Sequence, residues 1–236
     1  MSQKYDKLYR DVRYIEGLNA CMNCGVCTAI CPAAEFYDYD PRVICNTLLS
    51  RDDQKIENLL VSDTIWYCGQ CLSCKTRCPR GNVPALLISA LRHLSQETGL
   101  FIHSMKGRQQ YAIMKTIGKN ILSTGYCVHP DLVDPQLHPE QGPVWKWYRE
   151  NTEEVSDKLG ANYNKEGAGA LRKIPKKNLD EIHEIFKVTG GDAFRKKVEK
   201  ISEEKAKELG FHCEDEIMNS EYFFHLYTSN NETDHS

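Results

Sequence analysis

The apolar residues of the N-terminal half recur every three or four positions, a spacing that predicts amphipathic α-helices. Three segments show it: residues 40–48, 52–60 and 84–98. Asp40 followed by Pro41 favours a helix start in the first segment, and Gly99 favours a helix end after the third. No segment alternates apolar and polar residues as a half-buried strand would. The pattern predicts an all-α fold.

The C-terminal half has the same helical spacing in segments separated by longer breaks. We predict helices at residues 143–159, 178–189 and 192–209. Residues 100–142 contain His, Pro and Gly in an irregular run and predict a long surface connection between helical pieces. Trp145, Trp147 and Tyr148 indicate either a core or a subunit interface, and the residues themselves do not decide between the two.

Composition excludes several classes of protein. The 236 residues carry a net charge of -3 without a long run of like charges, which argues against a dedicated nucleic-acid surface. No apolar stretch approaches the roughly 18 to 20 residues needed to span a bilayer. The N-terminal residues contain no apolar segment typical of a secretory signal, so we expect a cytoplasmic protein. Eleven cysteines in such a chain indicate metal binding more than disulfides.

Eight of the cysteines form two copies of one pattern, Cys-x2-Cys-x2-Cys-x3-Cys-Pro. We call residues 21–31 the first cysteine run and residues 68–78 the second cysteine run. The x2 spacings allow three thiolates to reach three irons of one 4Fe-4S cluster, and the fourth cysteine is carried away to ligate the other cluster. The metal ligands predicted are Cys21, Cys24, Cys27 and Cys78 for cluster I, and Cys68, Cys71, Cys74 and Cys31 for cluster II.

A pair of structural zinc sites is the main alternative. Zinc sites use Cys-x2-Cys pairs that lie some distance apart in the sequence, whereas each run here has four closely spaced cysteines and ends in Cys-Pro. Gly25, Gly69 and Ser73 are small residues within the runs, and they allow backbone N–H groups to approach cluster sulfurs. All four ligand positions of each cluster are filled by cysteine, which favours electron transfer over chemistry at an open iron and leaves no catalytic residue to assign.

Cys45, Cys127 and Cys213 lie outside the two runs. Each is solitary, and the simplest interpretation is a small apolar residue that is buried or partly buried. His129 and His212 lie close to two of them in the sequence and keep open a redox-active thiol or an extra ligand. We assign these cysteines no role.

The cysteine runs and their helical surroundings resemble a known family. The residues that carry the resemblance are Cys21-Met22-Asn23-Cys24-Gly25-Val26-Cys27-Thr28-Ala29-Ile30-Cys31-Pro32, Tyr39-Asp40-Pro41-Arg42, and Ile65-Trp66-Tyr67-Cys68 through Cys78-Pro79-Arg80-Gly81. They cover roughly residues 15 to 100 and resemble the α-helical ferredoxin domain of iron–sulfur subunits, in particular the C subunit of heterodisulfide reductase. The C-terminal extension is similar to that of the C subunit in the heterodisulfide-reductase-like complex of sulfur-oxidising prokaryotes.

The resemblance implies a function and partners. The C subunit of such a complex relays electrons through two 4Fe-4S clusters between a flavin-containing A-like subunit and a B-like subunit, which is the catalytic thiol/disulfide protein. A free ferredoxin-like carrier, or the iron–sulfur subunit of another anaerobic dehydrogenase, stays open as an alternative. The expected organisation is an α-helical ferredoxin domain with two 4Fe-4S clusters at 1–100, a helical and loop-rich extension for subunit docking at 101–226, and a disordered tail at 227–236.

Overall fold

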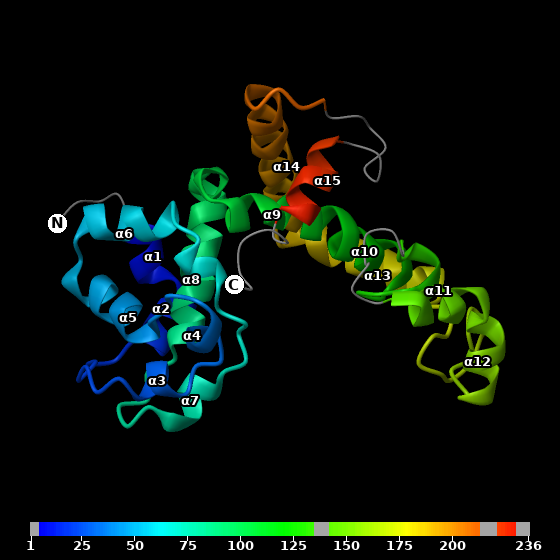
Figure 1. Cartoon of the computed structure of the whole chain (residues 1–236), viewed down its shortest axis with the longest axis horizontal. Coiled ribbons are helices and arrows are strands. Elements are labelled where there is room, and N and C mark those ends of the chain that lie inside the picture. The colour runs from blue at the N-terminus through cyan, green and yellow to red at the C-terminus, as the bar shows by residue number, and fades with distance from the viewer. Residues whose placement is uncertain (1–4, 135–141, 213–220, 230–236) are drawn as a thin grey trace. The chain divides into compact units, whose positions relative to one another are not determined.

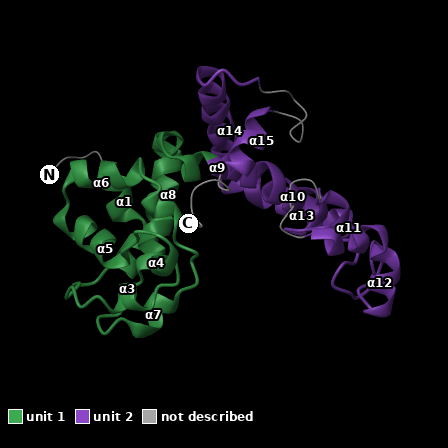
Figure 2. Ribbon diagram, in the orientation of Figure 1, with its two compact units in different colours: residues 1–108 green, residues 109–236 purple. Residues whose placement is uncertain are grey.

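The computed structural model describes residues 5–134, 142–212 and 221–229. Within these residues the chain forms helices and no strand (Figure 1), which confirms the all-α class. The chain divides into two compact units, residues 1–108 and residues 109–236 (Figure 2), which we call unit 1 and unit 2.

Unit 1 consists of short helices around one longer helix, α8. The elements that lie within it are α1 (Asp6–Arg10), α2 (Val12–Gly17), α3 (Val26–Ala29), α4 (Ala33–Phe36), α5 (Pro41–Ser50), α6 (Asp53–Leu60), the 3-10 helix η1 (Thr64–Trp66), α7 (Ser73–Arg77), α8 (Pro84–Thr98) and the 3-10 helix η2 (Leu100–His103). Helix α8 contacts α1, α2, α5, α6 and α7 (Figure 1), so it forms the central support of the unit.

The local sequence explains where these helices begin and end. The Asp40 side chain accepts hydrogen bonds from the backbone N–H of Arg42, at 2.8 Å, and of Val43, at 3.4 Å, so it caps α5 as its sequence predicts. Helix α8 starts with Pro84 at its first turn and ends at Gly99, which takes the left-handed conformation with φ 81°. Both helices confirm the spacing-based predictions.

The core of unit 1 lies between α8 and the helices around it. Leu87, Ile88 and Leu91 on α8 have no exposed surface and pack with the buried apolar residues of α5 and α6. Burying three such side chains removes apolar area that contributes about 1.5 to 3 kcal/mol each to stability. The cysteine runs are attached to this core, because α3 in the first run contacts α5 and α7 in the second run contacts α8.

Unit 2 contains further helices and a polar loop region. Helix α9 (Met105–Ile113) crosses the boundary between the units; beyond it lie the π-helical turn η3 (Met114–Gly118), α10 (Lys119–Thr124), the 3-10 helix η4 (Pro130–Leu132), α11 (Gly142–Glu150), α12 (Thr152–Lys158), α13 (Lys176–Val188), α14 (Gly191–Glu208) and α15 (Glu221–Thr228). Tyr222 on α15 is fully buried, and its ring lies 6.0 Å from that of Tyr111 and 5.5 Å from that of Phe211. These aromatic contacts join α9, the end of α14 and α15.

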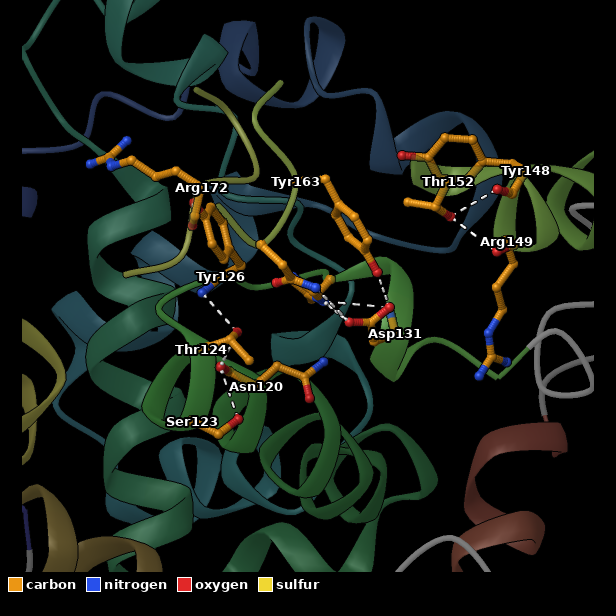
Figure 3. A network of polar contacts seen from close by, with 12 residues as sticks. Asn120, Ser123, Thr124, Tyr126, Asp131, Tyr148, Arg149, Thr152, Tyr163 and Arg172 are labelled. Carbon is orange, nitrogen blue, oxygen red and sulfur yellow. Dashed lines mark hydrogen bonds and ion pairs between the residues drawn. The ribbon is translucent and has the colours of Figure 1, made fainter. Parts of the chain in front are cut away.

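The loops of unit 2 are held by a polar network that Figure 3 shows from close by. Asp131 accepts hydrogen bonds from the hydroxyl of Tyr163 and, at 3.1 Å, from the side-chain amide of Asn164. The Tyr126 hydroxyl donates to the Arg172 backbone oxygen at 2.7 Å. Burial and the contact with Asp131 raise the pKa of Tyr163 to about 12. The network links residues 126–131, which include the start of the 3-10 helix η4, to residues 163–172.

The structure corrects several expectations for the C-terminal half. Residues 105–124 are helical, although the sequence predicted an irregular connection there. The helix predicted at 143–159 is interrupted at Asn151, between α11 and α12. Helix α15 includes the first two residues of the expected tail, and residues 230–236 of that tail, like residues 135–141 of the connection, lie outside the described residues.

Two further observations concern exposure. Trp147 is 56% exposed while Trp145 and Tyr148 are partly buried, so the three aromatic residues do not form a shared buried core. Among the described residues, no helix combines the length and the apolar composition that crossing a membrane would require.

Candidate iron–sulfur centre

The two cysteine runs follow the same backbone path. The third residue of each run has a left-handed conformation, at Asn23 with φ 56° and at Gln70 with φ 53°. The fifth residue does so as well, at Gly25 with φ 78° and at Leu72 with φ 62°. Two left-handed residues in five turn the chain around a common centre, so the first three cysteines of each run point inward toward one volume. The sequence repeat is thus also a structural repeat.

Cys21, Cys24, Cys27 and Cys78, which we call the first quartet, line one small cavity of about 20 Å³. Three of them come from the first run, and Cys78 comes from the end of α7 in the second run. The backbone N–H of Asn82 donates to the Cys78 Sγ at 3.3 Å. A backbone N–H directed at a cysteine sulfur stabilises the thiolate, which is the form that ligates a metal.

Cys31, Cys68, Cys71 and Cys74, which we call the second quartet, line another cavity of about 240 Å³. Three come from the second run, and Cys31 follows α3 at the end of the first. The Gln70 backbone N–H lies 3.4 Å from the Cys68 Sγ, and the Ser73 hydroxyl lies 3.4 Å from the Cys71 Sγ. The Ser73 hydrogen bond lowers the pKa of Cys71, whereas burial raises the pKa of Cys74.

The two quartets contain the same cysteines that the spacing grouped for clusters I and II, each with its fourth member contributed by the other run. Pro84, the first residue of α8, lines both cavities, so the two sites are neighbours. Thiolate sulfurs that bind one zinc ion would lie about 4 Å apart, given Zn–S bonds of ~2.3 Å. Within the described residues no three Cys, His, Asp or Glu side chains meet around a single point in this way. Each quartet lines its own cavity, of about 20 Å³ for the first and about 240 Å³ for the second, and sets of four cysteine thiolates are the ligands of 4Fe-4S clusters.

Aromatic residues form much of the second cavity. Tyr37 and Tyr67 stack with ring centroids 4.2 Å apart, and Tyr39 meets Tyr67 edge-on at 6.3 Å. Tyr39 is 3% exposed, and its hydroxyl has no hydrogen-bond acceptor at normal distance among the described residues. Burial, followed by the adjacent Cys68, raises the pKa of Tyr39. A buried hydroxyl without an acceptor is costly, and a cluster sulfur in this cavity would satisfy it.

An arginine lies beside Cys68, a member of the second quartet. Arg92 on α8 donates to the backbone oxygens of Ile65 and Cys68, both at 2.7 Å, and its guanidinium lies 5.5 Å from the centre of the Trp66 ring. Among the described residues no carboxylate forms an ion pair with Arg92. Burial lowers the pKa of Arg92, but a guanidinium stays protonated in proteins. The second quartet therefore has an unneutralised positive charge beside it.

The first cavity has a different electrostatic environment. Arg42 lines it, but its guanidinium pairs with Asp40 at 2.8 Å. Asp40 also accepts a hydrogen bond from the Thr28 hydroxyl, next to Cys27 in the sequence. Burial alone would raise the pKa of Asp40, but the bonds from Thr28 and Arg42 outweigh it and hold that pKa below its usual value. The ion pair contributes little net charge to the first site.

The three cysteines outside the runs differ from one another. Cys45 is 1% exposed, and it lines the first cavity beside the first quartet. Burial and the neighbouring cysteines raise its pKa, so it is a neutral thiol. Cys127 is exposed, which contradicts the expectation of a buried apolar residue. Cys213 lies outside the described residues.

Comparison with known proteins agrees with this site. Residues 17–82 match the 4Fe-4S dicluster domain family, a segment that contains both cysteine runs. Over 144 residues the chain is 33% identical to the C subunit of ferredoxin:CoB-CoM heterodisulfide reductase of Methanosarcina acetivorans, covering 61% of this chain and 54% of that protein. Over 147 residues it is 31% identical to the iron-sulfur C 2 subunit of CoB–CoM heterodisulfide reductase of Methanocaldococcus jannaschii, covering 60% of this chain and 72% of that protein.

The helical fold, the cysteine-lined cavities and the matched domain define an iron–sulfur electron-transfer subunit that binds 4Fe-4S clusters. More particularly, the chain belongs to the family of heterodisulfide reductase C subunits. The chain spans about half of the Methanosarcina relative and about 72% of the Methanocaldococcus relative.

Proposed function

We propose that this protein relays single electrons through two 4Fe-4S clusters within a heterodisulfide reductase or heterodisulfide-reductase-like complex. The electron donor and acceptor would be a flavin-containing A-like subunit and a catalytic B-like subunit, the second of which performs the thiol/disulfide chemistry. The observation that supports the relay most strongly is the pair of neighbouring cavities, each lined by one of the two quartets and both lined by Pro84. Family membership supports the type of complex.

The first quartet is proposed to ligate cluster I and the second quartet to ligate cluster II. Each cluster would then be held by both cysteine runs, so the loss of either cluster would loosen both runs. When bound, a 4Fe-4S cluster supplies a site that gains or loses one electron without transferring a chemical group. The chain's own residues position the thiolates and direct N–H and O–H groups at the sulfurs. With all ligand positions taken by cysteine, the chain itself supplies no open site for a substrate.

The surface near the quartets supports electron exchange with partners. Cys24 and Cys71 are the exposed members of the first and second quartets. Each has an exposed apolar neighbour, Met22 at 60% and Leu72 at 43%. Apolar side chains beside an exposed ligand favour close contact with another protein at the point where an electron would enter or leave.

The rest of the chain fits a role in assembly. We propose residues 1–100 as the cluster domain and residues 101–226 as a docking extension, while the compact units divide at residues 108 and 109. Several large apolar side chains of unit 2 are exposed, among them Val144, Leu159 and Val188. Reducing compartments keep thiols free for metal binding, so the cytoplasm is the proposed location.

The proposal is tested by comparing the isolated chain with the assembled complex. The purified, cluster-loaded chain should accept electrons from dithionite but should not reduce or form a disulfide substrate by itself. Addition of the B-like protein should allow the reduced chain to transfer its electrons, measured under anaerobic conditions by the return of the absorbance of the oxidised clusters. Substantial disulfide turnover by the chain alone would contradict the relay.

A further inference from the structure

The two quartets share their ligand type and backbone geometry, but different groups surround them. We infer that Tyr39 and Arg92 give the cluster bound by the second quartet a higher reduction potential than the cluster bound by the first. This inference rests on the proposed two-cluster relay, and it adds the order of the two centres along it. Tyr39 and Arg92 would act as positioning and tuning residues, because neither is a ligand.

Tyr39 is the first reason for the difference. Tyr39 lines the second cavity together with Cys68, and its buried hydroxyl has no hydrogen-bond partner among the described residues. A phenol in this position would donate to a cluster sulfur or to the Cys68 thiolate. Donation to sulfur stabilises the more negative, reduced form and raises the reduction potential. Its ring cannot turn away freely, because it packs against Tyr67.

Arg92 is the second reason. Its two hydrogen bonds to backbone oxygens, one of them on the ligand Cys68, fix the guanidinium beside the second quartet. Since no described carboxylate pairs with it, its charge acts on the cluster without compensation. A fixed positive charge in a partly buried position attracts the extra electron more strongly than an exposed one, because water and salt screen it less.

The other hydrogen-bond donors near the two quartets do not reverse the inferred order of the two reduction potentials. Backbone N–H groups bond sulfurs of both quartets, among them Asn82 and Thr28 in the first and Gln70 and Ala85 in the second. A hydroxyl also lies beside a sulfur of each quartet, Thr28 at Cys27 and Ser73 at Cys71, so the hydroxyls do not distinguish the two. The extra sulfur group of the first cavity is Cys45, and a thiol is only a weak donor.

Charges near the first quartet are neutralised or screened. Arg42 is paired with Asp40, so its effect is largely cancelled. Arg80 also lines the first cavity, but it is exposed and its charge is screened by solvent. An electron reaching cluster I would therefore pass to cluster II, so that the first centre is oxidised and the second is reduced by the same electron. No bond forms or breaks in this step.

The test is an anaerobic redox titration of the full chain followed by EPR, with iron and sulfide measured in every sample. Tyr39→Phe removes only the hydroxyl, and Arg92→Gln removes the charge while keeping a donor for one backbone oxygen. For Arg92→Gln we expect the ratio of reduced to oxidised cluster at a fixed potential to fall about tenfold, or ~59 mV for a one-electron couple. Tyr39→Phe should shift the same centre in the same direction by less. That centre should be the higher-potential one in the unmodified protein.

Matched variants separate tuning from general damage. Tyr9→Phe removes another buried hydroxyl that has no hydrogen-bond partner among the described residues, at a residue that lines neither cysteine cavity, and should leave both potentials unchanged. Arg92→Lys keeps the charge and should retain most of the potential. Arg42→Gln leaves Asp40 unpaired beside the first quartet and should lower the potential of the other centre.

The outcomes distinguish the inference from the proposed function. If all variants hold two clusters but Tyr39→Phe and Arg92→Gln shift neither potential, or shift the lower one, the inference is wrong and the relay still stands. If the unmodified chain assembles fewer than two clusters, the proposed function itself fails. Equal shifts in Tyr9→Phe and Tyr39→Phe would also overturn the inference, because the effect would not depend on the second cavity.

Discussion

The two cysteine runs are nearly the same in spacing and in backbone path, but they differ in the residues that produce that path. Both runs need a left-handed residue at the third and fifth positions. The first run uses Asn23 and Gly25, which adopt this conformation at low cost, whereas the second uses Gln70 and Leu72, which do not. Cysteine spacing therefore determines which residues form each site, while the neighbouring residues determine the conformational strain and the electrostatics of each copy.

Replacing the fourth cysteine of a run is the strongest way to test the comparison. If the runs exchange their last ligands, Cys78→Ala should remove the same centre as Cys24→Ala, although Cys78 and Cys24 belong to different runs. Iron should fall from about eight to about four per chain in both variants. Cys31→Ala and Cys71→Ala should each remove the other centre. Measurement of iron and of the EPR signals decides between exchange and independent sites.

Cys127→Ala is the control for these ligand variants, because Cys127 is exposed and lines neither cysteine cavity. It should keep the full iron content. If Cys78→Ala instead removed the same centre as Cys74→Ala, each run would bind its own cluster and the exchange would be wrong.

Destabilising α8, which supports both cysteine runs, should reduce cluster retention in the two runs equally. Leu91 on α8 is fully buried, and Leu91→Ala leaves a cavity that costs about 2 to 5 kcal/mol of stability. Helix α8 contacts α7 of the second run, and it contacts α5, which in turn contacts α3 of the first run. Both clusters should therefore lose iron to a chelator faster and by similar factors. Urea unfolding under anaerobic conditions gives the stability change.

Leu159→Ala is the matched change on an exposed residue, since Leu159 is 77% exposed. Its stability change should stay within about 0.5 kcal/mol. Preferential loss of one cluster in Leu91→Ala would show that α8 supports only one of the runs.

Exchanging the residue types at the fifth positions of the two runs, Gly25 and Leu72, tests the difference in backbone strain between them. Leu72→Gly should stabilise the second run, because a left-handed leucine costs roughly 1 to 2 kcal/mol, and Gly25→Leu should destabilise the first run by a similar amount. A Cβ at position 25 would lie 3.7 Å from Arg42 Nη1, an ordinary contact, and the left-handed backbone opposes a leucine there. Thermal unfolding of the cluster-loaded variants measures both effects. Two changes of the same sign would mean that strain does not distinguish the runs.

Removal of iron should show the smallest difference. Without metal, hydrogen exchange should rise in both runs and remain low in α8, whose amide protons are protected by helical hydrogen bonds and a buried core. The rise should be greater at residues 68–74 than at residues 21–27, because Gln70 and Leu72 lose the constraint that offsets their conformational cost. Equal exchange in the two runs would contradict this reasoning.

The sequence was sufficient for the parts of the molecule that depend on short-range patterns. The caps and apolar spacing of α5, α6 and α8 give their bounds, and the cysteine spacing groups the eight candidate ligands into two sets whose binding of two clusters stays a prediction. Tyr39 and Arg92 could not be assigned a role in this way, because they lie far apart in the sequence and meet Cys68 only in the fold. The only sequence signal for Tyr39 was its place in the family-like segment that leads into α5.

The helices of residues 105–124 show a different limit. Gly107 and Gly118 within this stretch lower its helix propensity and favour a loop interpretation. In the structure Gly107 is required by close packing, because a Cβ at this position would collide with the Phe101 backbone oxygen. A glycine that permits a close approach cannot be told from a glycine that breaks a helix without the tertiary contacts.

Iron and acid-labile sulfide per chain, measured with EPR of the dithionite-reduced protein purified without oxygen, test the central claim most directly. The account predicts about eight of each and signals from two magnetically coupled 4Fe-4S centres. Four or fewer irons, or zinc in their place, would contradict the assignment of two clusters to the two quartets.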